Sequence, residues 1–249
     1  MSLVVKHEFK AADEEKSVVS NKEAIICVGS TGTGKSSLIK LYCGDNVVVG
    51  HHTQSQTINS TLFQESKSND RYWLDSQGAN CSSGTNDAKV LTDILKKLYD
   101  EKINKIKVIW CVSGDMCREK QEFQAQAKFI KLLGDNIWNS CLIIKKMGKP
   151  IPKKMNGVLS AANKCGANIK DDDKKRLYGF KALDHGDFAD DDLYNYTSNE
   201  KHMELGFFHD DQILSGVTHK LSQLPIAQIN FTIEKCNKCG IKGDRRFVY

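Results

Sequence analysis

Residues 29–36 match the phosphate-binding pattern G-x-x-x-x-G-K-[ST] at every fixed position. In this pattern, glycines let backbone N–H groups surround phosphate oxygens, and the start of the next helix adds partial positive charge. We expect the Lys35 ammonium to reach the β- and γ-phosphates and the Ser36 hydroxyl to ligate Mg²⁺. The residues predicted to contact the nucleotide or its metal are Gly29, Thr31, Gly32, Thr33, Gly34, Lys35, Ser36 and Ser37.

A second element with fitting chemistry begins at Asp75, 40 residues after Lys35. The run Asp75-Ser76-Gln77-Gly78 has the form D-x-x-G and follows an apolar, strand-like segment. In GTPase-type switches the Asp of this element holds Mg²⁺ through water, and the Gly N–H meets the γ-phosphate. We expect these roles for Asp75 and Gly78, although an Asp-initiated turn is the simpler interpretation. Gln77 either orients the attacking water or only shapes the turn.

A switch threonine is expected between these two elements, because it gives Mg²⁺ an oxygen when the γ-phosphate is present. The segment 53–61 contains three threonines. Thr57 is our choice, since it directly precedes an expected strand. Thr53 and Thr61 stay open as alternatives, as does the interpretation that these polar residues belong to an ordinary surface loop.

Short β-rich segments alternate with helical ones along the chain. This predicts an α/β fold, a P-loop NTPase with a mostly parallel central sheet flanked by helices on both faces. The helix at 86–101 has its apolar residues on one face, and Thr85 or Asn86 could cap it. The expected strands are 24–28, 58–64, 71–75, 106–112, 141–145 and 178–182, and the expected helices are 35–43, 86–101, 119–133, 156–164 and 209–223.

The composition narrows the class of protein. The chain has 249 residues, 40% hydrophobic content and a net charge of +5 that is spread along the sequence, so it gives no clear sign of a nucleic-acid partner. No apolar run approaches the ~18 residues of a membrane span, and the start of the chain carries no secretory or myristoylation signal. Nine irregularly spaced cysteines favour reduced thiols. We expect a cytoplasmic protein.

The expected organisation is a flexible or edge lead-in at 1–22, a P-loop GTPase-like domain at 23–228 and a C-terminal segment at 229–249. The last segment contains Cys236 and Cys239, which have the spacing of half a zinc knuckle. A structural zinc site needs four ligands, and no second pair follows; His209 and His219 are the other candidates. An incomplete or idle cysteine pair is therefore preferred over zinc.

The chain resembles the immunity-associated nucleotide-binding GTPases (AIG-type G domain), relatives of the septins within the P-loop GTPase class. The resemblance covers roughly residues 22–225. It implies binding of Mg²⁺ and GTP or GDP, and nucleotide-dependent homodimers or oligomers that form through the nucleotide face. The segments that carry it are 29–36, Ser55-Gln56-Thr57, 75–78, and the stretch 108–115 followed by 133–138 and the strand 141–144.

The sequence departs from the usual GTPase pattern in base recognition. An Asp in N/T-K-x-D normally accepts two hydrogen bonds from guanine, but Gly148 stands at that position here, two residues after Lys146. Lys146 could still stack over the base. Either Asp184, after the expected strand 178–182, supplies the carboxylate, or base selectivity is relaxed.

The sequence also departs from the usual GTPase pattern at a position that serves hydrolysis. Ala79 follows D-x-x-G, where small GTPases carry a water-orienting Gln. In the resembled family an Arg after the fourth core strand acts across a dimer interface. Arg118 is the candidate for such a finger, which would stabilise transition-state charge in trans; a surface arginine at a helix start is the alternative. The sequence predicts a GTP-binding switch with slow or dimer-assisted hydrolysis. A non-hydrolysing nucleotide-binding scaffold with relaxed base specificity is the alternative. A small-molecule kinase is disfavoured, because the sequence shows no Arg-rich segment that resembles a kinase lid.

Overall fold

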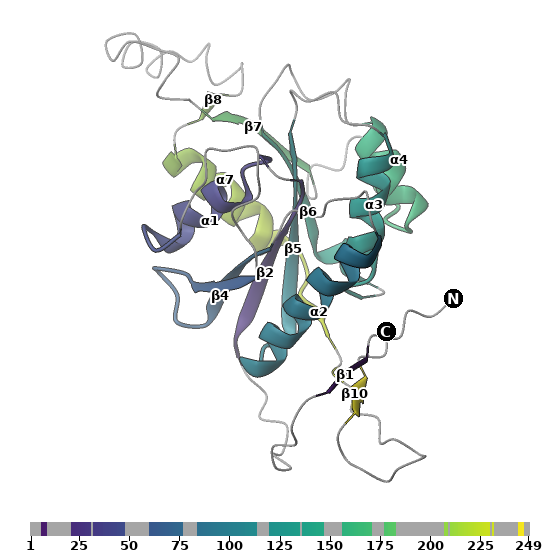
Figure 1. Cartoon of the computed structure of the whole chain (residues 1–249). Helices are drawn as coiled ribbons and strands as arrows, with labels where there is room; N and C mark the ends of the chain where they lie inside the picture. Colours follow the sequence, from purple (N-terminus) through teal and green to yellow (C-terminus); the bar gives the residue numbers. More distant parts are fainter. Residues whose placement is uncertain are drawn as a thin grey trace.

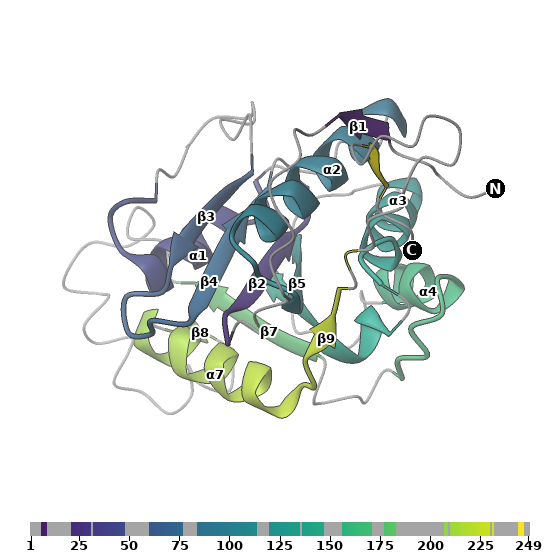
Figure 2. The same cartoon turned by 90° about the horizontal axis from the view of Figure 1, so that it is seen from below.

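The central sheet has the strand order β3-β4-β2-β5-β6-β7-β8, with β9 paired to β5 outside this path (Figure 1; β3 and β9 are labelled in Figure 2). All neighbours are parallel except β3 with β4 and β9 with β5, which are antiparallel. The computed structural model describes residues 6–8, 21–30, 32–47, 60–76, 84–113, 120–134, 136–146, 156–170, 177–182, 207–208, 210–229, 231 and 244–246. The α/β class and the mostly parallel sheet predicted from the sequence are therefore confirmed.

The strands lie close to their predicted places, with one clear exception. Ser60 is outside any strand, so the strand expected at 58–64 is shorter and begins at Thr61. The short strands β8 and β9 were not predicted, because two residues carry no readable alternation. The bounds are β2 Glu23–Val28, β3 Thr61–Gln64, β4 Arg71–Asp75, β5 Lys105–Ser113, β6 Cys141–Lys146, β7 Leu177–Ala182, β8 Phe207–Phe208 and β9 Ala227–Gln228.

Helices cover both faces of the sheet, as predicted. Figure 1 shows α1 and α7 on one face and α2, α3 and α4 on the other, and the view from below in Figure 2 separates the same two groups. The bounds are α1 Lys35–Cys43, α2 Gly84–Asp100, α3 Lys120–Lys131, α4 Asn156–Lys164 and α7 Asp210–Gln223, with a 3₁₀ turn at Ile137–Ser140. Because α2 begins at Gly84, Thr85 and Asn86 lie inside the helix, and the prediction that one of them caps it is wrong.

The alternation of side chains along β2 creates two hydrophobic cores. Ala24, Ile26 and Val28 pack in the core beneath α2, α3 and α4, whereas Ile25 and Cys27 pack in the core beneath α1 and α7. Both sets are almost completely buried, as expected for a central parallel strand whose side chains alternate between two covered faces. This double burial fixes the strand that leads into residues 29–36.

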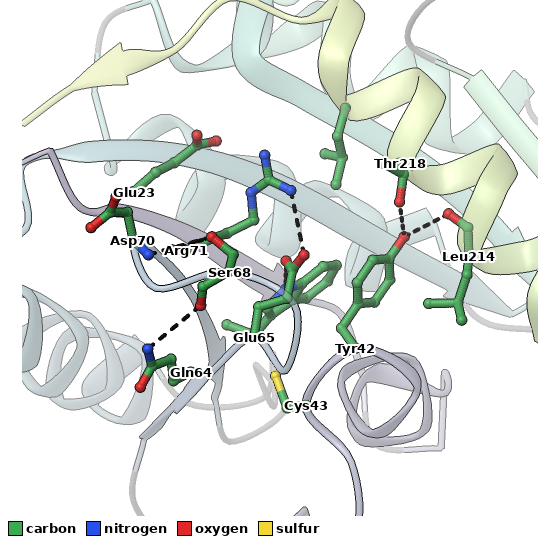
Figure 3. Close-up of polar contacts among 12 residues, drawn as sticks. Glu23, Tyr42, Cys43, Gln64, Glu65, Ser68, Asp70, Arg71, Leu214 and Thr218 are labelled. Carbon is green, nitrogen blue, oxygen red and sulfur yellow. Dashed lines mark hydrogen bonds and ion pairs between the residues drawn. The ribbon is translucent and has the colours of Figure 1, made fainter.

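The far end of α1 is tied to α7 and to the β3–β4 turn (Figure 3). The Tyr42 hydroxyl donates to the Leu214 carbonyl at 3.0 Å and lies 3.0 Å from the Thr218 hydroxyl. The Tyr42 ring stacks on Trp73, with 4.1 Å between the ring centroids, and the Trp73 indole N–H donates to Glu65 at 2.9 Å. These contacts hold the C-terminal end of the helix that carries Lys35 and Ser36.

A separate two-stranded antiparallel sheet pairs β1 Lys6–Glu8 with β10 Asp244–Arg246, so residues of the lead-in and of the C-terminal segment contact each other. In the part of the chain that the structure describes, no helix has the length and apolar character to cross a membrane. The domain limits at 23 and 228 stay predictions, and Ile229 packs in the core with α2 and β5.

Candidate nucleotide site

The sheet brings the two main sequence elements to one edge. β2 and β4 are parallel neighbours, and Cys27 is paired in register with Asp75. The residues that follow β2 therefore lie beside the end of β4, although about forty-seven positions separate them along the chain. Ser76 secures this junction, because its hydroxyl donates to the Cys27 carbonyl at 3.0 Å. The structure thus places the phosphate-binding pattern and the start of D-x-x-G together at the carboxyl ends of the strands.

The backbone of the phosphate-binding loop (residues 29–36) requires its glycines. Gly32 and Gly34 have φ of 80° and 86°, in the left-handed region that favours glycine. Gly29 has φ of 150° and packs directly against β5, so a Cβ there would lie 2.3 Å from the Cys111 carbonyl oxygen. Gly34 is the N-cap of α1. The loop therefore leaves its strand and enters its helix through positions that a larger side chain would distort.

Lys35 lies across its own loop. Its Nζ donates to the carbonyl oxygens of Gly29 at 2.9 Å and Ser30 at 2.8 Å, and the residue is 7% exposed. Thr33 also donates to the Ser30 carbonyl, through its hydroxyl, at 2.8 Å. These contacts hold the Lys35 ammonium against the backbone of the loop. In a nucleotide complex, a phosphate oxygen would replace a loop carbonyl as the acceptor of its hydrogen bond.

Ser36 and Asp75 are the residues predicted to hold the metal, and their side chains lie in contact. The Ser36 hydroxyl donates to Asp75 Oδ2 at 2.8 Å, and Asp75 is 4% exposed. A hydroxyl and a carboxylate oxygen at this separation are the hard oxygen ligands that Mg²⁺ prefers. The residues present therefore fit a magnesium ion.

The thiol beneath the loop is protonated. Burial raises the pKa of Cys27 well above 9.0, and a hydrogen bond with Cys111 and the nearby carboxylate of Asp75 raise it further. Cys27 and Cys111 are both free and buried. A thiol in this state neither attacks a substrate nor binds a soft metal, because both require the thiolate.

Sequence reasoning missed the contacts of Ser30 with α3. The Ser30 hydroxyl donates to Glu122 Oε1, and the Gln126 amide donates to the Ser30 hydroxyl. No motif joins these positions, which are 92 and 96 residues apart. Their only signal is that Glu122 and Gln126 are four residues apart and therefore share one face of a helix.

Several predicted site residues lie outside the described part of the chain: Thr31, Thr57, Gln77, Gly78, Arg118 and Asp184. Lys146 is the last residue of β6 and pairs with Phe180 of β7. The alternative threonine, Thr61, is in β3 and is paired in register with Asp75.

The zinc prediction falls largely outside the described residues as well. Cys236, Cys239 and His209 are not among them, and His219 is exposed on α7, 2.9 Å from the Gln223 amide. Within the described ranges, no group of three or more His, Cys, Asp or Glu side chains is placed to hold a metal.

No protein-family model and no curated protein matches this chain. Among solved structures it is similar to Toc33 from Arabidopsis thaliana in complex with Mg²⁺ and GMPPNP, at TM-score 0.60 and 16% identity over 84% of this chain and 89% of that one. The chain has the fold of a P-loop GTPase.

Two further solved structures show the same likeness. A dimerization-deficient arginine-to-alanine mutant of Toc33 from Arabidopsis thaliana has TM-score 0.59 and 15% identity, covering 84% of this chain and 88% of that one. A structure from work on atToc33 and psToc159, in which dimerization is important for GTPase activity, has TM-score 0.56 and 13% identity over 83% and 85% of the two chains.

Proposed function

We propose that this protein is a GTP-binding switch of the GTPase class that binds Mg-GTP and Mg-GDP at the phosphate-binding loop. The carrying observation is the 2.8 Å hydrogen bond between Ser36 and Asp75. It joins the two sequence elements that a magnesium-nucleotide site requires, from the ends of neighbouring parallel strands. The Toc33 structures with GDP and Mg²⁺ and with Mg²⁺ and GMPPNP support this proposal, since they share the fold.

Each residue has a definite part in this site. Backbone N–H groups of the loop surround the phosphates, and Lys35 exchanges its loop carbonyls for β- and γ-phosphate oxygens. Ser36 would ligate the metal directly and Asp75 would hold it through water, with Thr57 as the switch ligand. A bound Mg²⁺ would neutralise charge on the β- and γ-phosphate oxygens. Gly78 meets the γ-phosphate through its backbone N–H.

The guanine preference rests on the family resemblance and on Lys146 at the end of β6, where it would stack over the base. Asp184 is the proposed acceptor for the guanine edge in place of Gly148. Base discrimination then depends on a carboxylate that follows β7, the neighbour of β6 in the sheet. Relaxed base specificity is the outcome expected if Asp184 does not take this part.

Hydrolysis is proposed to be slow in the monomer and faster in a homodimer formed through the nucleotide face. Arg118 is the proposed trans-acting residue and Gln77 the proposed water-orienting one. Work in which dimerization is important for the GTPase activity of atToc33 and psToc159 supports this model by likeness of fold. The narrower place in the immunity-associated family and a cytoplasmic location belong to the same proposal.

The function is tested by nucleotide binding and turnover on the purified chain. We expect GTP and GDP to bind in the presence of Mg²⁺, ATP to bind more weakly, and phosphate release per molecule to rise with protein concentration. Lys35→Ala should weaken GTP affinity by roughly 10- to 100-fold, the range for a lost hydrogen bond to a charged group. Lys40→Ala is the matched control, because Lys40 is on the same helix and its side chain is 45% exposed.

Three results would redirect the proposal. Tight GTP binding without phosphate release would establish the non-hydrolysing scaffold. A preference for ATP would overturn the guanine assignment. Normal nucleotide binding by the Lys35→Ala variant would remove the phosphate-binding loop from the site altogether.

A further inference from the structure

Ser30 is the point at which the phosphate-binding loop is joined to α3. Its side chain faces inward, and the residue is 2% exposed. The Ser30 hydroxyl donates to Glu122 Oε1 and accepts from the Gln126 amide. Both partners come from consecutive turns of α3, and the Gln126 amide also donates to Glu122 Oε1 at 3.5 Å. Three side chains therefore form a closed set of hydrogen bonds at the base of the loop.

The core of the protein fixes the orientation of this set. The Trp110 indole N–H donates to Gln126 Oε1 at 2.6 Å. Because indole is only a donor, it must meet the amide oxygen, which leaves the Gln126 nitrogen facing Ser30. Trp110 is completely buried and packs against Phe123 and Trp138, with ring centroids 6.5 and 6.1 Å away. The fixed indole therefore sets the orientation of the Gln126 amide, and the Ser30 hydroxyl donates to Glu122 because a carboxylate only accepts.

The backbone of the same residue contacts the groups that would bind phosphate. The Ser30 carbonyl accepts from Lys35 Nζ and from the Thr33 hydroxyl, each at 2.8 Å. Holding the Ser30 side chain therefore also fixes the direction of its carbonyl. That carbonyl sets where the Lys35 ammonium lies before a nucleotide arrives, so the loop is preorganised and less ordering is needed on binding.

We propose that Glu122 and Gln126 are positioning residues for nucleotide binding, acting through Ser30 without touching the nucleotide. The proposal rests on the function proposed above and deepens it. A carboxylate is an unfavourable neighbour for a phosphate, because like charges repel. Its presence beside the loop is accounted for by the hydrogen bond that it accepts from Ser30. The Glu122 oxygen is useful as the hydrogen-bond acceptor of Ser30, whereas the negative charge of Glu122 opposes the binding of phosphate.

Two variants of Glu122 should therefore have different effects on nucleotide affinity. Glu122→Ala removes the acceptor and should weaken the affinity for a fluorescent GDP analogue by roughly tenfold, as for a buried hydrogen bond to a charged group. Glu122→Gln keeps an acceptor oxygen and removes the charge, so its affinity should equal or exceed that of the unmodified protein. Ser30→Ala should show the same loss as Glu122→Ala.

The double variant Ser30→Ala/Glu122→Ala tests whether the residues act as a unit. We expect its affinity to be no weaker than that of the weaker single variant, because each change already breaks the same connection. Lys128→Ala, an exposed position on the same helix, is the control and should bind normally. Thermal unfolding without nucleotide is measured in parallel, since a merely structural role would lower the melting temperature and leave affinity unchanged in the folded variants.

The outcomes separate the two proposals. If the unmodified protein binds no guanine nucleotide, the proposed function itself fails. If the unmodified protein binds, Lys35→Ala binds much more weakly, and Ser30→Ala and Glu122→Ala bind within twofold of normal, the positioning role is wrong. Multiplying losses in the double variant, or a Glu122→Gln variant as weak as Glu122→Ala, would overturn it too. Should Glu122→Ala not fold, Ser30→Ala and Glu122→Gln decide the question alone.

Discussion

The hydroxyl of Ser36 donates to Asp75 Oδ2 at 2.8 Å, although the two residues are 39 positions apart in the chain. Ser36 is in the first turn of α1 and Asp75 ends β4. The contact exists because β2 and β4 are parallel neighbours, so that the elements following them start from the same edge of the sheet. It makes the Mg²⁺ dependence of nucleotide binding the most direct measurement of this site.

Ser36→Ala should abolish most of the gain in GDP affinity that Mg²⁺ provides. The expected change is about tenfold or more, since even residues that only support metal ligands alter affinity by that factor. The measurement is GDP affinity with Mg²⁺ and with EDTA. Ser66→Ala, an exposed position in the β3–β4 turn, serves as the control. An unchanged ratio in the Ser36 variant would remove this hydroxyl from the metal site.

Gly29→Ala should be far more destabilising than Gly32→Ala. A Cβ at Gly29 would lie 2.3 Å from the Cys111 carbonyl oxygen, whereas nothing lies within 4 Å of one at Gly32. Both positions have positive φ, so Gly32→Ala carries only the conformational cost, about 1–2 kcal/mol. Gly29→Ala should add about 1–3 kcal/mol for overpacking against backbone. Urea unfolding without nucleotide measures both, and equal losses would contradict the steric argument.

Lys107→Met should unfold the protein at a clearly lower urea concentration. Lys107 Nζ forms an ion pair with Glu23 at 3.3 Å and donates to the Leu221 carbonyl at 3.0 Å, with both side chains largely buried. Removing one partner of a buried pair leaves an uncompensated charge and costs about 3–5 kcal/mol. Adding Glu23→Gln should recover part of this loss.

An exposed pair provides the comparison for that experiment. Lys22 and Glu101 are 3.4 Å apart, with side chains 33% and 51% exposed. Lys22→Ala should therefore cost less than about 1 kcal/mol, because solvent screens such pairs. Comparable losses at Lys22 and Lys107 would mean that burial does not govern the ion pair in the sheet.

Tyr42→Phe isolates the connection between α1 and α7. The change keeps the ring on Trp73 and removes the hydroxyl that contacts Leu214 and Thr218. The expected loss of stability is about 1 kcal/mol, the usual net value of one hydrogen bond. Unfolding curves with and without GDP should shift by the same amount, since Tyr42 is at the far end of the helix from the loop. A variant as stable as the unmodified protein would show that the hydroxyl contributes nothing.

The cysteine Cys43 should make stability fall at high pH. Burial and the nearby Glu65 carboxylate raise its pKa from 9.0 to about 12. The folded state therefore favours the protonated thiol, and its contribution is complete below pH 9 and lost as the pH rises from 9 towards 12. The stability difference between the unmodified protein and a Cys43→Ala variant should shrink across that window. A difference that is constant with pH would contradict the raised pKa.

Local patterns predicted most of the fold, because the relevant signals lie within single segments. The apolar positions of α2 recur at helical spacing, and Gly44, with φ of 80°, ends α1 where a helix stop was expected. Parallel central strands are apolar throughout, which makes β2 and β6 easy to recognise. Elements of two residues, such as β8 and β9, depend on contacts with distant strands and have no signal of their own.

The candidate site likewise has residues that the sequence predicts and contacts that it does not. Lys35, Ser36 and Asp75 could be chosen from spacing, because a loop and a strand end fix their positions relative to one another. The partnership of Ser30 with Glu122 could not, since it depends on how α3 lies against the sheet. Cys27 belongs to no motif, and only the structure shows its thiol hydrogen-bonded with Cys111.

The central place of β2 has a consequence for the growing chain. β2 is made before both of its neighbours in the sheet, β4 and β5, which follow it in the sequence. Until Lys105–Ser113 has left the ribosome, this apolar strand has no complete set of partners. Such unpaired strands are prone to aggregate and bind chaperones readily. Shielding during synthesis should therefore matter more for this protein than for one built from neighbouring hairpins.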